Sequence, residues 1–149
     1  MKNKFIIFFL LFFFNFKILN ADKYLFEVSN MSVSENGNLI KANNGKIFSE
    51  ENNLEINAEK YKYNKSLNLL NAINGDIILK RENLHIIFKK LLINDKGFLT
   101  ASDGIIINDL QNSLSLESEN IILDRGKNIL TASDGIIIND LQNSLSLES

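Results

Sequence analysis

The chain of 149 residues contains no cysteine, no proline and no tryptophan, and it has a single histidine. The absence of cysteine excludes a disulfide framework and a thiolate metal site. His85 has no second histidine with which to hold a metal ion, and it lacks the positioned partner that acid–base catalysis needs. The chain also has no P-loop and no G-x-S-x-G elbow. We therefore predict that the protein is not an enzyme and uses no metal or cofactor.

A cluster of basic residues is also missing. Beyond residue 21 the chain has 13 basic and 18 acidic residues, because Lys2, Lys4 and Lys17 precede that point. From Leu99 onward, two basic residues stand against eight acidic ones. Nucleic-acid binding needs clustered lysine and arginine side chains that displace counterions from phosphates. We therefore expect no nucleic-acid partner.

One long hydrophobic run is present, at the start of the chain, and it reads MKNKFIIFFLLFFFNFKILNA. Ten unbroken apolar residues, Phe5–Phe14, follow the first two lysines. This is well short of the ~20 residues that a membrane-spanning helix needs. A charged start, a short apolar middle and a small residue at the end, here Ala21, are typical of a secretory signal. We predict that residues 1–21 are a cleaved signal peptide, with an uncleaved anchor as the alternative, and that residues 22–149 form one domain.

The rest of the chain consists of repeats. The run LTASDGIIINDLQNSLSLES occurs twice, at 99–118 and at 130–149. A weaker pattern, A-x-x-G, begins at Ala42, Ala72, Ala101 and Ala132, with spacings of 30, 29 and 31 residues. An apolar residue precedes each alanine by two positions, and an isoleucine follows each glycine by two. We interpret the chain as four copies of one structural unit.

Each unit has the pattern of two β-strands. Leu54, Ile56 and Ala58 alternate with polar residues, as a strand with one buried face does. Segments rich in Asn, Asp and Gly separate the strands, and these residues tolerate left-handed backbone angles. The A-x-[ND]-G element fits either a tight hairpin turn or a bulge that bends one long strand. We favour the bend, because the neighbouring turns already reverse the chain.

Four such units predict an all-β, antiparallel meander of roughly eight strands, preceded by a strand near residues 26–33. A sheet of this kind must curl or fold over in order to hide its apolar face.

The segment LIKANNGKIFSEENNLEINAEKYKY, with its A-x-x-G bend followed by L-x-I-x-A, resembles the OstA-like domain of the lipopolysaccharide-transport (Lpt) proteins. The resemblance extends over residues 25–149 and includes the periplasmic bridge protein and the N-terminal domain of the outer-membrane translocon. It implies a folded-over β-jellyroll, or half-pipe, in the periplasm. Its interior would hold the acyl chains of lipid A, and such domains would join edge to edge with other Lpt proteins or with copies of themselves. The basic residues that would lie near lipid phosphates are Lys80, Arg81, Lys89 and Lys90.

An acyl chain in transit needs an apolar slot, since exposing it to water costs ~0.8 kcal/mol per CH₂. The recurring apolar positions of the repeat are the predicted inward-facing, lipid-binding set. This set is Ile40, Ala42, Ile47, Leu54, Ile56, Ala58, Leu70, Ala72, Ile77, Leu84, Ile86, Phe88, Leu99, Ala101, Ile106, Leu114 and Leu116. The alternative is that these side chains pack on one another as an ordinary closed core.

The second copy of the identical run stops at Ser149, the counterpart of Ser118, where the first copy continues. We predict that the final repeat is truncated. Either its edge pairs with another chain, or the sequence is a piece of a longer protein. Two other classes of function stay open. One is a structural β-solenoid or adhesin-like surface protein, which would have a parallel sheet. The other is a stand-alone lipid-binding β-barrel.

Overall fold

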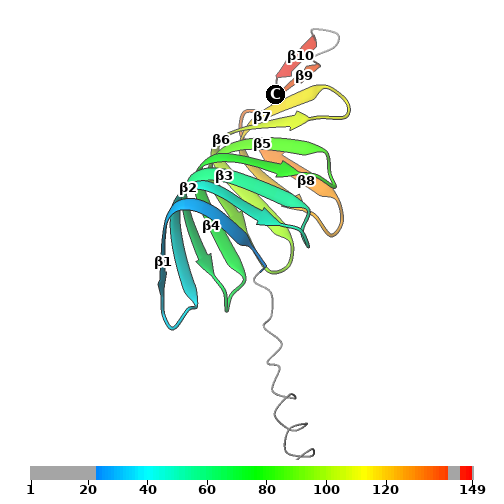
Figure 1. The fold of residues 1–149 in the computed structure, drawn as a ribbon. Coiled ribbons are helices and arrows are strands. Elements are labelled where there is room, and N and C mark those ends of the chain that lie inside the picture. Colours follow the sequence, from blue (N-terminus) through cyan, green and yellow to red (C-terminus); the bar gives the residue numbers. More distant parts are fainter. Residues whose placement is uncertain (1–22, 141–144, 149) are drawn as a thin grey trace, which may run out of the picture.

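The computed structural model describes residues 23–140 and 145–148, which form strands, turns and short connections (Figure 1). The predicted signal peptide lies outside these described residues. The strands are β1 (Leu25–Ser34), β2 (Leu39–Ser49), β3 (Leu54–Asn64), β4 (Leu69–Leu79), β5 (Leu84–Ile93), β6 (Phe98–Asp109), β7 (Leu114–Asp124), β8 (Ile129–Ser133), β9 (Ile137–Asp140) and β10 (Leu145–Glu148). Within the described part of the chain, no helix is long and apolar enough to cross a membrane.

All ten strands belong to one antiparallel sheet. Its order is β1-β2-β3-β4-β5-β6-β7-β9-β10, and β8 pairs with β7 beside β9. From β1 to β8, strands that follow each other in sequence are paired neighbours joined by turns of a few residues, whereas β8 and β9 both pair with β7 and not with each other. The all-β class and the antiparallel, half-pipe arrangement of two-strand repeats are therefore confirmed. The parallel sheet that a β-solenoid requires is excluded.

The sheet bends along a line that crosses β1 to β5 at one residue per strand. On this line, one residue of each strand falls between paired positions of the ladder, and successive ones are 15 residues apart. These residues are Ser29, Asn44, Glu59, Asn74 and Lys89. Two of them have left-handed backbone angles, with φ of 50° at Asn44 and 53° at Asn74. The A-x-[ND]-G element thus bends a continuous strand and does not form a hairpin, as the sequence predicted.

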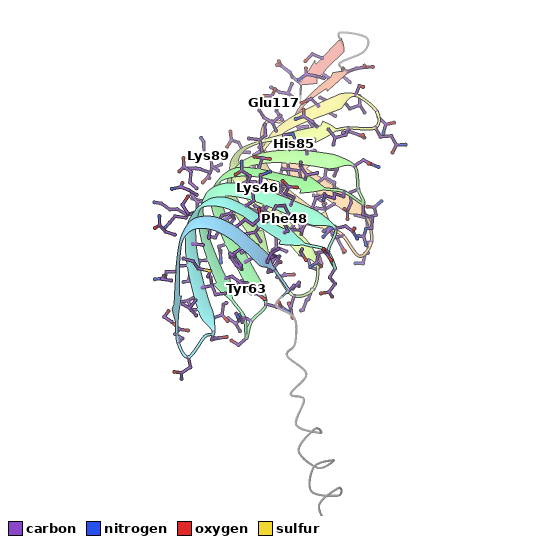
Figure 2. All side chains as sticks on the ribbon, in the orientation of Figure 1. Lys46, Phe48, Tyr63, His85, Lys89 and Glu117 are labelled. Carbon is purple, nitrogen blue, oxygen red and sulfur yellow. The ribbon has the colours of Figure 1, made fainter. Side chains whose placement is uncertain are left out.

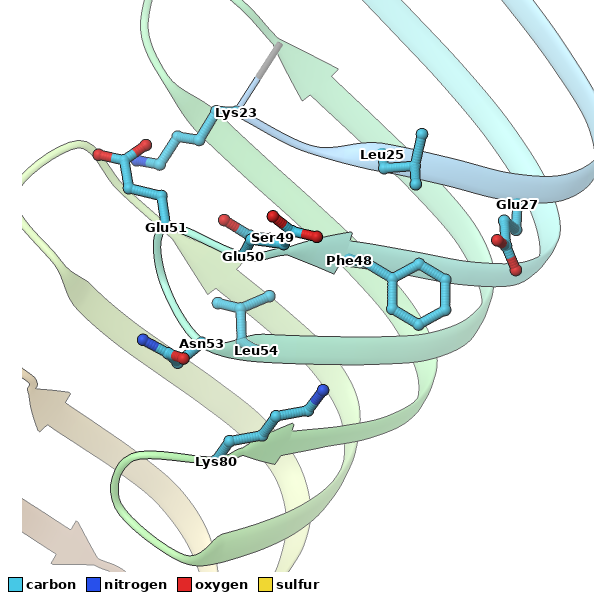
Figure 3. A pocket seen from close by; sticks show the side chains of 10 residues that line it. All are labelled: Lys23, Leu25, Glu27, Phe48, Ser49, Glu50, Glu51, Asn53, Leu54 and Lys80. Carbon is cyan, nitrogen blue, oxygen red and sulfur yellow. The ribbon is translucent and has the colours of Figure 1, made fainter. Parts of the chain in front are cut away.

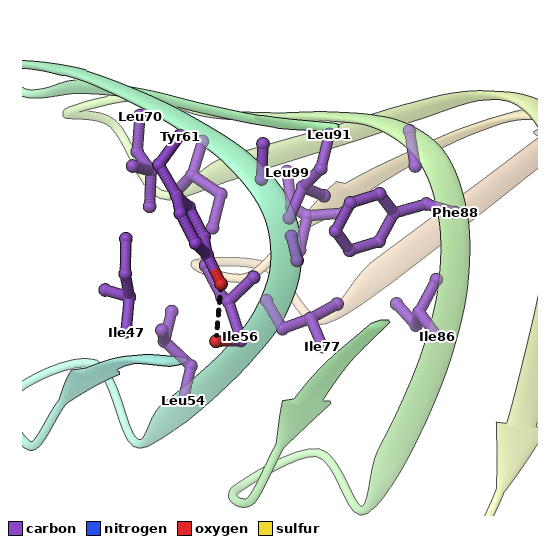
Figure 4. Packing of buried hydrophobic residues seen from close by; sticks show 14 of the residues in the cluster. Ile47, Leu54, Ile56, Tyr61, Leu70, Ile77, Ile86, Phe88, Leu91 and Leu99 are labelled. Carbon is purple, nitrogen blue, oxygen red and sulfur yellow. Dashed lines mark hydrogen bonds between the residues drawn. The ribbon is translucent and has the colours of Figure 1, made fainter. Parts of the chain in front are cut away.

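The bend divides the sheet into two arms. Arm A contains the strand ends on the side of the β1–β2, β3–β4, β5–β6 and β7–β8 turns. Arm B contains the strand ends on the opposite side, near the β2–β3, β4–β5 and β6–β7 turns, together with β9 and β10. The inner faces of both arms contribute to one hydrophobic cluster (Figure 4). Lys89 lies outside the arch that the strands form, and Tyr63 lies within it (Figure 2).

Tyr61 shows how closely the two arms approach. Its hydroxyl lies 3.0 Å from the Ile56 carbonyl oxygen of the same strand and 2.7 Å from the Gly45 carbonyl oxygen (Figure 4). In a straight strand, five residues span roughly 17 Å, which is far beyond the reach of a tyrosine side chain. The hydroxyl can reach this carbonyl only because β3 folds back on itself at the bend.

The two identical runs adopt different structures. In the first copy the run forms most of β6, a continuous strand of 12 residues that pairs with β5 on one side and β7 on the other. In the second copy the residues equivalent to β6, 130–140, are split into β8 and β9, which lie along the same edge of β7. β6 is held in one piece by a partner on each side, whereas β8 pairs only with β7 in the described residues.

Candidate functional site

The candidate site is the inner face of the folded sheet. In arm B, one apolar residue per strand continues across the whole width of the sheet through directly paired positions. This arm B row is Phe26, Ile47, Ile56, Ile77, Ile86, Ile107, Leu116, Ile138 and Leu147. The equivalent arm A row is Val33, Ile40, Tyr63, Leu70, Ile93, Leu99, Leu123 and Leu130. The period of two in each strand therefore builds two uninterrupted apolar rows that face each other.

Most of the predicted inward-facing residues lie in this interior. The thirteen that are buried are Ile40, Ala42, Ile47, Leu54, Ile56, Ala58, Leu70, Ala72, Ile77, Ile86, Phe88, Leu99 and Ala101. Leu84 and Leu116 are partly buried and pack against the same cluster. In the middle of the sheet these side chains pack on one another, as in an ordinary core.

The prediction that Ile106 faces inward is wrong. Ile106 lies on the outer face with 37% of its surface exposed, and its neighbours Ile105 and Ile107 are buried. The cause is a bulge in β6, where the pairing with β7 shifts between Ser102 and Ile105. A shift of one residue sends every following side chain to the opposite face.

Leu114 differs from the prediction for another reason. It shares the inner face with Leu116, but 39% of its surface is exposed. Its partner across β9 is Asp140, so no apolar neighbour continues its row toward the edge.

The sequence analysis missed the tyrosines of the interior. Tyr24 and Tyr63 stack edge to face with ring centroids 4.9 Å apart, and Tyr63 belongs to the arm A row. Burial raises the pKa of Tyr61 to about 12 and raises the pKa of Tyr24 further. A signal was present for two of them, because Tyr61 and Tyr63 stand at alternate positions of the strand that begins at Leu54.

The tips of the two arms meet at a polar contact, which we call the seam. It consists of Arg125 from the β7–β8 turn of arm A, and of Asn52, Arg81 and Glu82 from two turns of arm B. The Arg125 Nε and Nη2 atoms donate to the two Glu82 carboxylate oxygens at 2.8 and 2.9 Å, and Nη2 also donates to the Asn52 carbonyl oxygen at 2.7 Å. Arg81 donates to the Arg125 carbonyl oxygen at 2.8 Å.

The Arg125–Glu82 pair of the seam is almost completely shielded from water, whereas the Arg81 side chain is 59% exposed. The side chains of Arg125 and Glu82 are 8% and 3% exposed. Burial alone would raise the pKa of the Glu82 carboxyl, but the hydrogen bonds and positive charges of Arg125 and Arg81 outweigh it, so that this pKa is lowered. Nearby, the buried Tyr24 hydroxyl has no hydrogen-bond partner among the described residues, and Arg125 and Glu51 both influence its pKa.

At its two ends the interior is less completely covered. In β1, Met31 and Val33 face inward but are more than half exposed. At the other end, exposure along the arm B row rises from 3% at Ile107 to 70% at Leu147. The arm B row therefore continues from β1 to β10, and the arm A row continues from β1 to β8.

A pocket of about 630 Å³ lies at the tip of arm B beside β1, next to the seam turns (Figure 3). Its lining combines apolar and charged side chains, and Leu54 is its one member from the predicted set. The lining residues are Lys23, Leu25, Glu27, Phe48, Ser49, Glu50, Glu51, Asn53, Leu54 and Lys80.

The four basic residues that the family resemblance pointed to are not brought together. Lys80 lines the pocket just described, and Arg81 belongs to the seam. Lys90 forms an ion pair of 2.7 Å with Asp103, and Lys89 lies on the bend line.

His85 contacts Asp76 at 3.2 Å on the polar outer face. The described residues contain no group of three or more histidine, cysteine or acidic side chains that could hold a metal ion.

The chain matches no model of a known protein family, and it matches no curated protein. The OstA-like resemblance therefore stays a prediction from the sequence.

Proposed function

We propose that the protein binds lipopolysaccharide outside the cytoplasmic membrane, in the periplasm, and carries it toward the outer membrane. In this proposal the acyl chains lie between the two arms and the sugar and phosphate groups stay outside. The observation that carries the proposal is the pair of apolar rows that run across the sheet. The arm A row becomes exposed at β1, and the arm B row becomes exposed at β9 and β10. An apolar path that opens at each end can pass a hydrocarbon chain from one domain to the next.

The edges of the sheet support the second part of the proposal, which is edge-to-edge assembly. The sheet path ends at β1 and β10, so it is not closed into a barrel within the described residues. A strand at the end of a sheet presents backbone N–H and C=O groups that can pair with another strand. Pairing with a second copy, or with another jellyroll protein of the same transport system, would extend both rows.

Binding can be tested with substitutions on the two faces of the sheet. Val33→Glu places a charge on the inner face at an open end, and Ile122→Glu places the same charge on the outer face, where Ile122 is 48% exposed. Because a charge in an apolar slot must be desolvated, Val33→Glu should weaken binding of purified lipopolysaccharide by roughly tenfold or more. Ile122→Glu should leave binding unchanged. Equal binding by the two variants would contradict the proposal.

Assembly is tested separately, by sedimentation over a range of protein concentrations. Concentration-dependent head-to-tail oligomers are expected. A protein that binds lipid but stays monomeric at every concentration would instead be a stand-alone lipid-binding protein.

A further inference from the structure

The middle of the interior is closed. Ile56, Ile77 and Ile86 in the arm B row have no exposed surface, and they contact the side chains of arm A within one cluster. If acyl chains lie between the arms, as the proposed function requires, the arms must separate somewhere to admit them. The inference below therefore rests on the proposed function and concerns where this separation occurs.

The seam is the polar contact between the arm tips. Arg125 lies 43 residues from Glu82 and 73 residues from Asn52, and its guanidinium joins both of their turns. All of these residues lie in turns, outside the ladder of backbone hydrogen bonds. The contact can therefore break without disrupting any strand pairing.

Two features make the seam easier to open than the rest of the interior. A charged pair that separates regains the hydration of both ions, which offsets much of the lost attraction. Apolar core contacts have no such compensation, because water is a poor partner for them. In addition, the Tyr24 hydroxyl, whose pKa the Arg125 charge influences, is buried without a partner in the described part of the chain, and an unsatisfied hydroxyl is a cost that opening would remove.

From these observations we infer that the seam formed by Arg125, Glu82, Arg81 and Asn52 is a releasable closure. Separation of the arm tips at this point admits a hydrocarbon chain sideways into the apolar interior, and re-formation of the Arg125–Glu82 pair retains it. The pocket of about 630 Å³ adjoins the same turns, and Leu25, Phe48 and Leu54 give it an apolar part in which a chain can first be held.

The position of the arm tips can be measured directly, because the chain contains no cysteine. Glu50→Cys and Lys127→Cys introduce two unique exposed thiols, one in the β2–β3 turn and one in the β7–β8 turn. Spin labels at these positions should give one short distance in the parent protein. In Glu82→Gln they should give an additional, longer distance. The matched control is Glu55→Gln, which breaks the Lys46–Glu55 ion pair of 2.7 Å on the outer face and should leave the distance unchanged.

Entry is measured with a polyene fatty acid whose fluorescence rises in apolar surroundings. Glu82→Gln should take up this probe roughly tenfold faster than the parent or Glu55→Gln, since hydrogen bonds to a charged group no longer hold the tips. A cleavable cross-link between the two introduced thiols should block uptake, and cleavage of the linker should restore it. Because Glu50 lines the pocket, the same linker attached to the Glu50→Cys thiol alone is the control, and it should leave uptake unchanged. The cross-linking experiment keeps the native Arg125–Glu82 pair, so it does not depend on the folding of Glu82→Gln.

The outcomes separate the two proposals. Uptake that is equally fast with and without the cross-link would overturn the seam as the entrance and leave the proposed function standing. Absence of uptake by every variant would overturn both. Blocked uptake in the cross-linked protein, together with a longer distance in Glu82→Gln alone, is the result that we expect.

Discussion

Ile106 and Ile137, which occupy equivalent positions of the two identical runs, pair with the same residue, Glu117, from its two sides. β7 thus lies between residues 99–109 of the first copy and the equivalent residues 130–140 of the second, and both segments use the same register against it. Ala101 and Ala132 likewise both pair with Ile121. The duplication therefore adds one further unit to the sheet without changing the pairing rules.

The bulge in β6 can be tested by one substitution at two adjacent positions. Ile105→Thr should lower the free energy of unfolding by about 2–3 kcal/mol, because it buries a hydroxyl and leaves a cavity. Ile106→Thr should change it by less than about 0.5 kcal/mol, because this side chain is on the outer face. Threonine keeps the β-branched shape, so strand propensity is matched. Urea unfolding measures both, and a larger loss for Ile106→Thr would place the bulge elsewhere.

The register of β6 after its bulge could not be predicted from the pattern of residues. Leu54, Ile56 and Ala58 alternate with polar residues, so their inward direction follows from the sequence. The three isoleucines after Gly104 do not alternate with polar residues. Apolar side chains would therefore face inward whether the strand turned Ile106 inward or turned Ile105 and Ile107 inward. The choice is made by the backbone, since Asp103 and Gly104 both have left-handed angles that add one residue to the strand.

The close approach of strands at the bend predicts a strong effect at Gly75. A Cβ atom there would overlap the Asn57 carbonyl oxygen and would lie 2.6 Å from the Ala58 Cβ atom. Gly75→Ala should therefore destabilise the protein by about 2–4 kcal/mol, because backbone must move. At Gly126 the nearest atom would be 3.4 Å away, so Gly126→Ala should be almost neutral. Equal midpoints of thermal unfolding for the two variants would contradict this explanation.

Two buried tyrosines predict opposite results for the same substitution. Tyr61→Phe removes a hydroxyl that bonds across the bend, and it should cost about 1 kcal/mol. Tyr24→Phe removes a buried hydroxyl that has no partner within residues 23–140 and 145–148, and it should be neutral or stabilising. Chemical denaturation of the two variants gives the comparison. A loss of stability in Tyr24→Phe would show that its hydroxyl bonds to a group such as a buried water molecule.

The seam could not be predicted from the sequence. Arg125 and Glu82 carry no local pattern that links them, and their meeting depends on how far the sheet curls between β4 and β7. The bend line was easier to recognise, because every unit contributes one element to it, whereas the seam occurs once. Repetition in the sequence therefore predicts the structure of each unit, but it does not predict contacts between units that are far apart in the chain.

The lowered pKa of Glu82 predicts how stability changes in acid. Its ordinary pKa is 4.5, and although burial opposes the change, Arg125 and Arg81 lower this pKa in the folded state. The unfolded chain therefore takes up a proton before the folded protein does, so the stabilisation by Glu82 is complete well above pH 4.5 and is lost as the pH falls below it.

Glu82→Gln should be less stable than the parent by about 3 kcal/mol at pH 6, because it leaves the Arg125 charge buried without its carboxylate partner. The difference should narrow at pH 3, because Glu82 of the unfolded parent has by then taken up a proton, which reduces what the carboxylate contributes to the stability of the parent. Urea unfolding of both proteins at the two pH values measures this, with Glu55→Gln as the control that keeps the seam. A difference that stays constant between pH 6 and pH 3 would show that the Glu82 carboxylate does not hold the arms together.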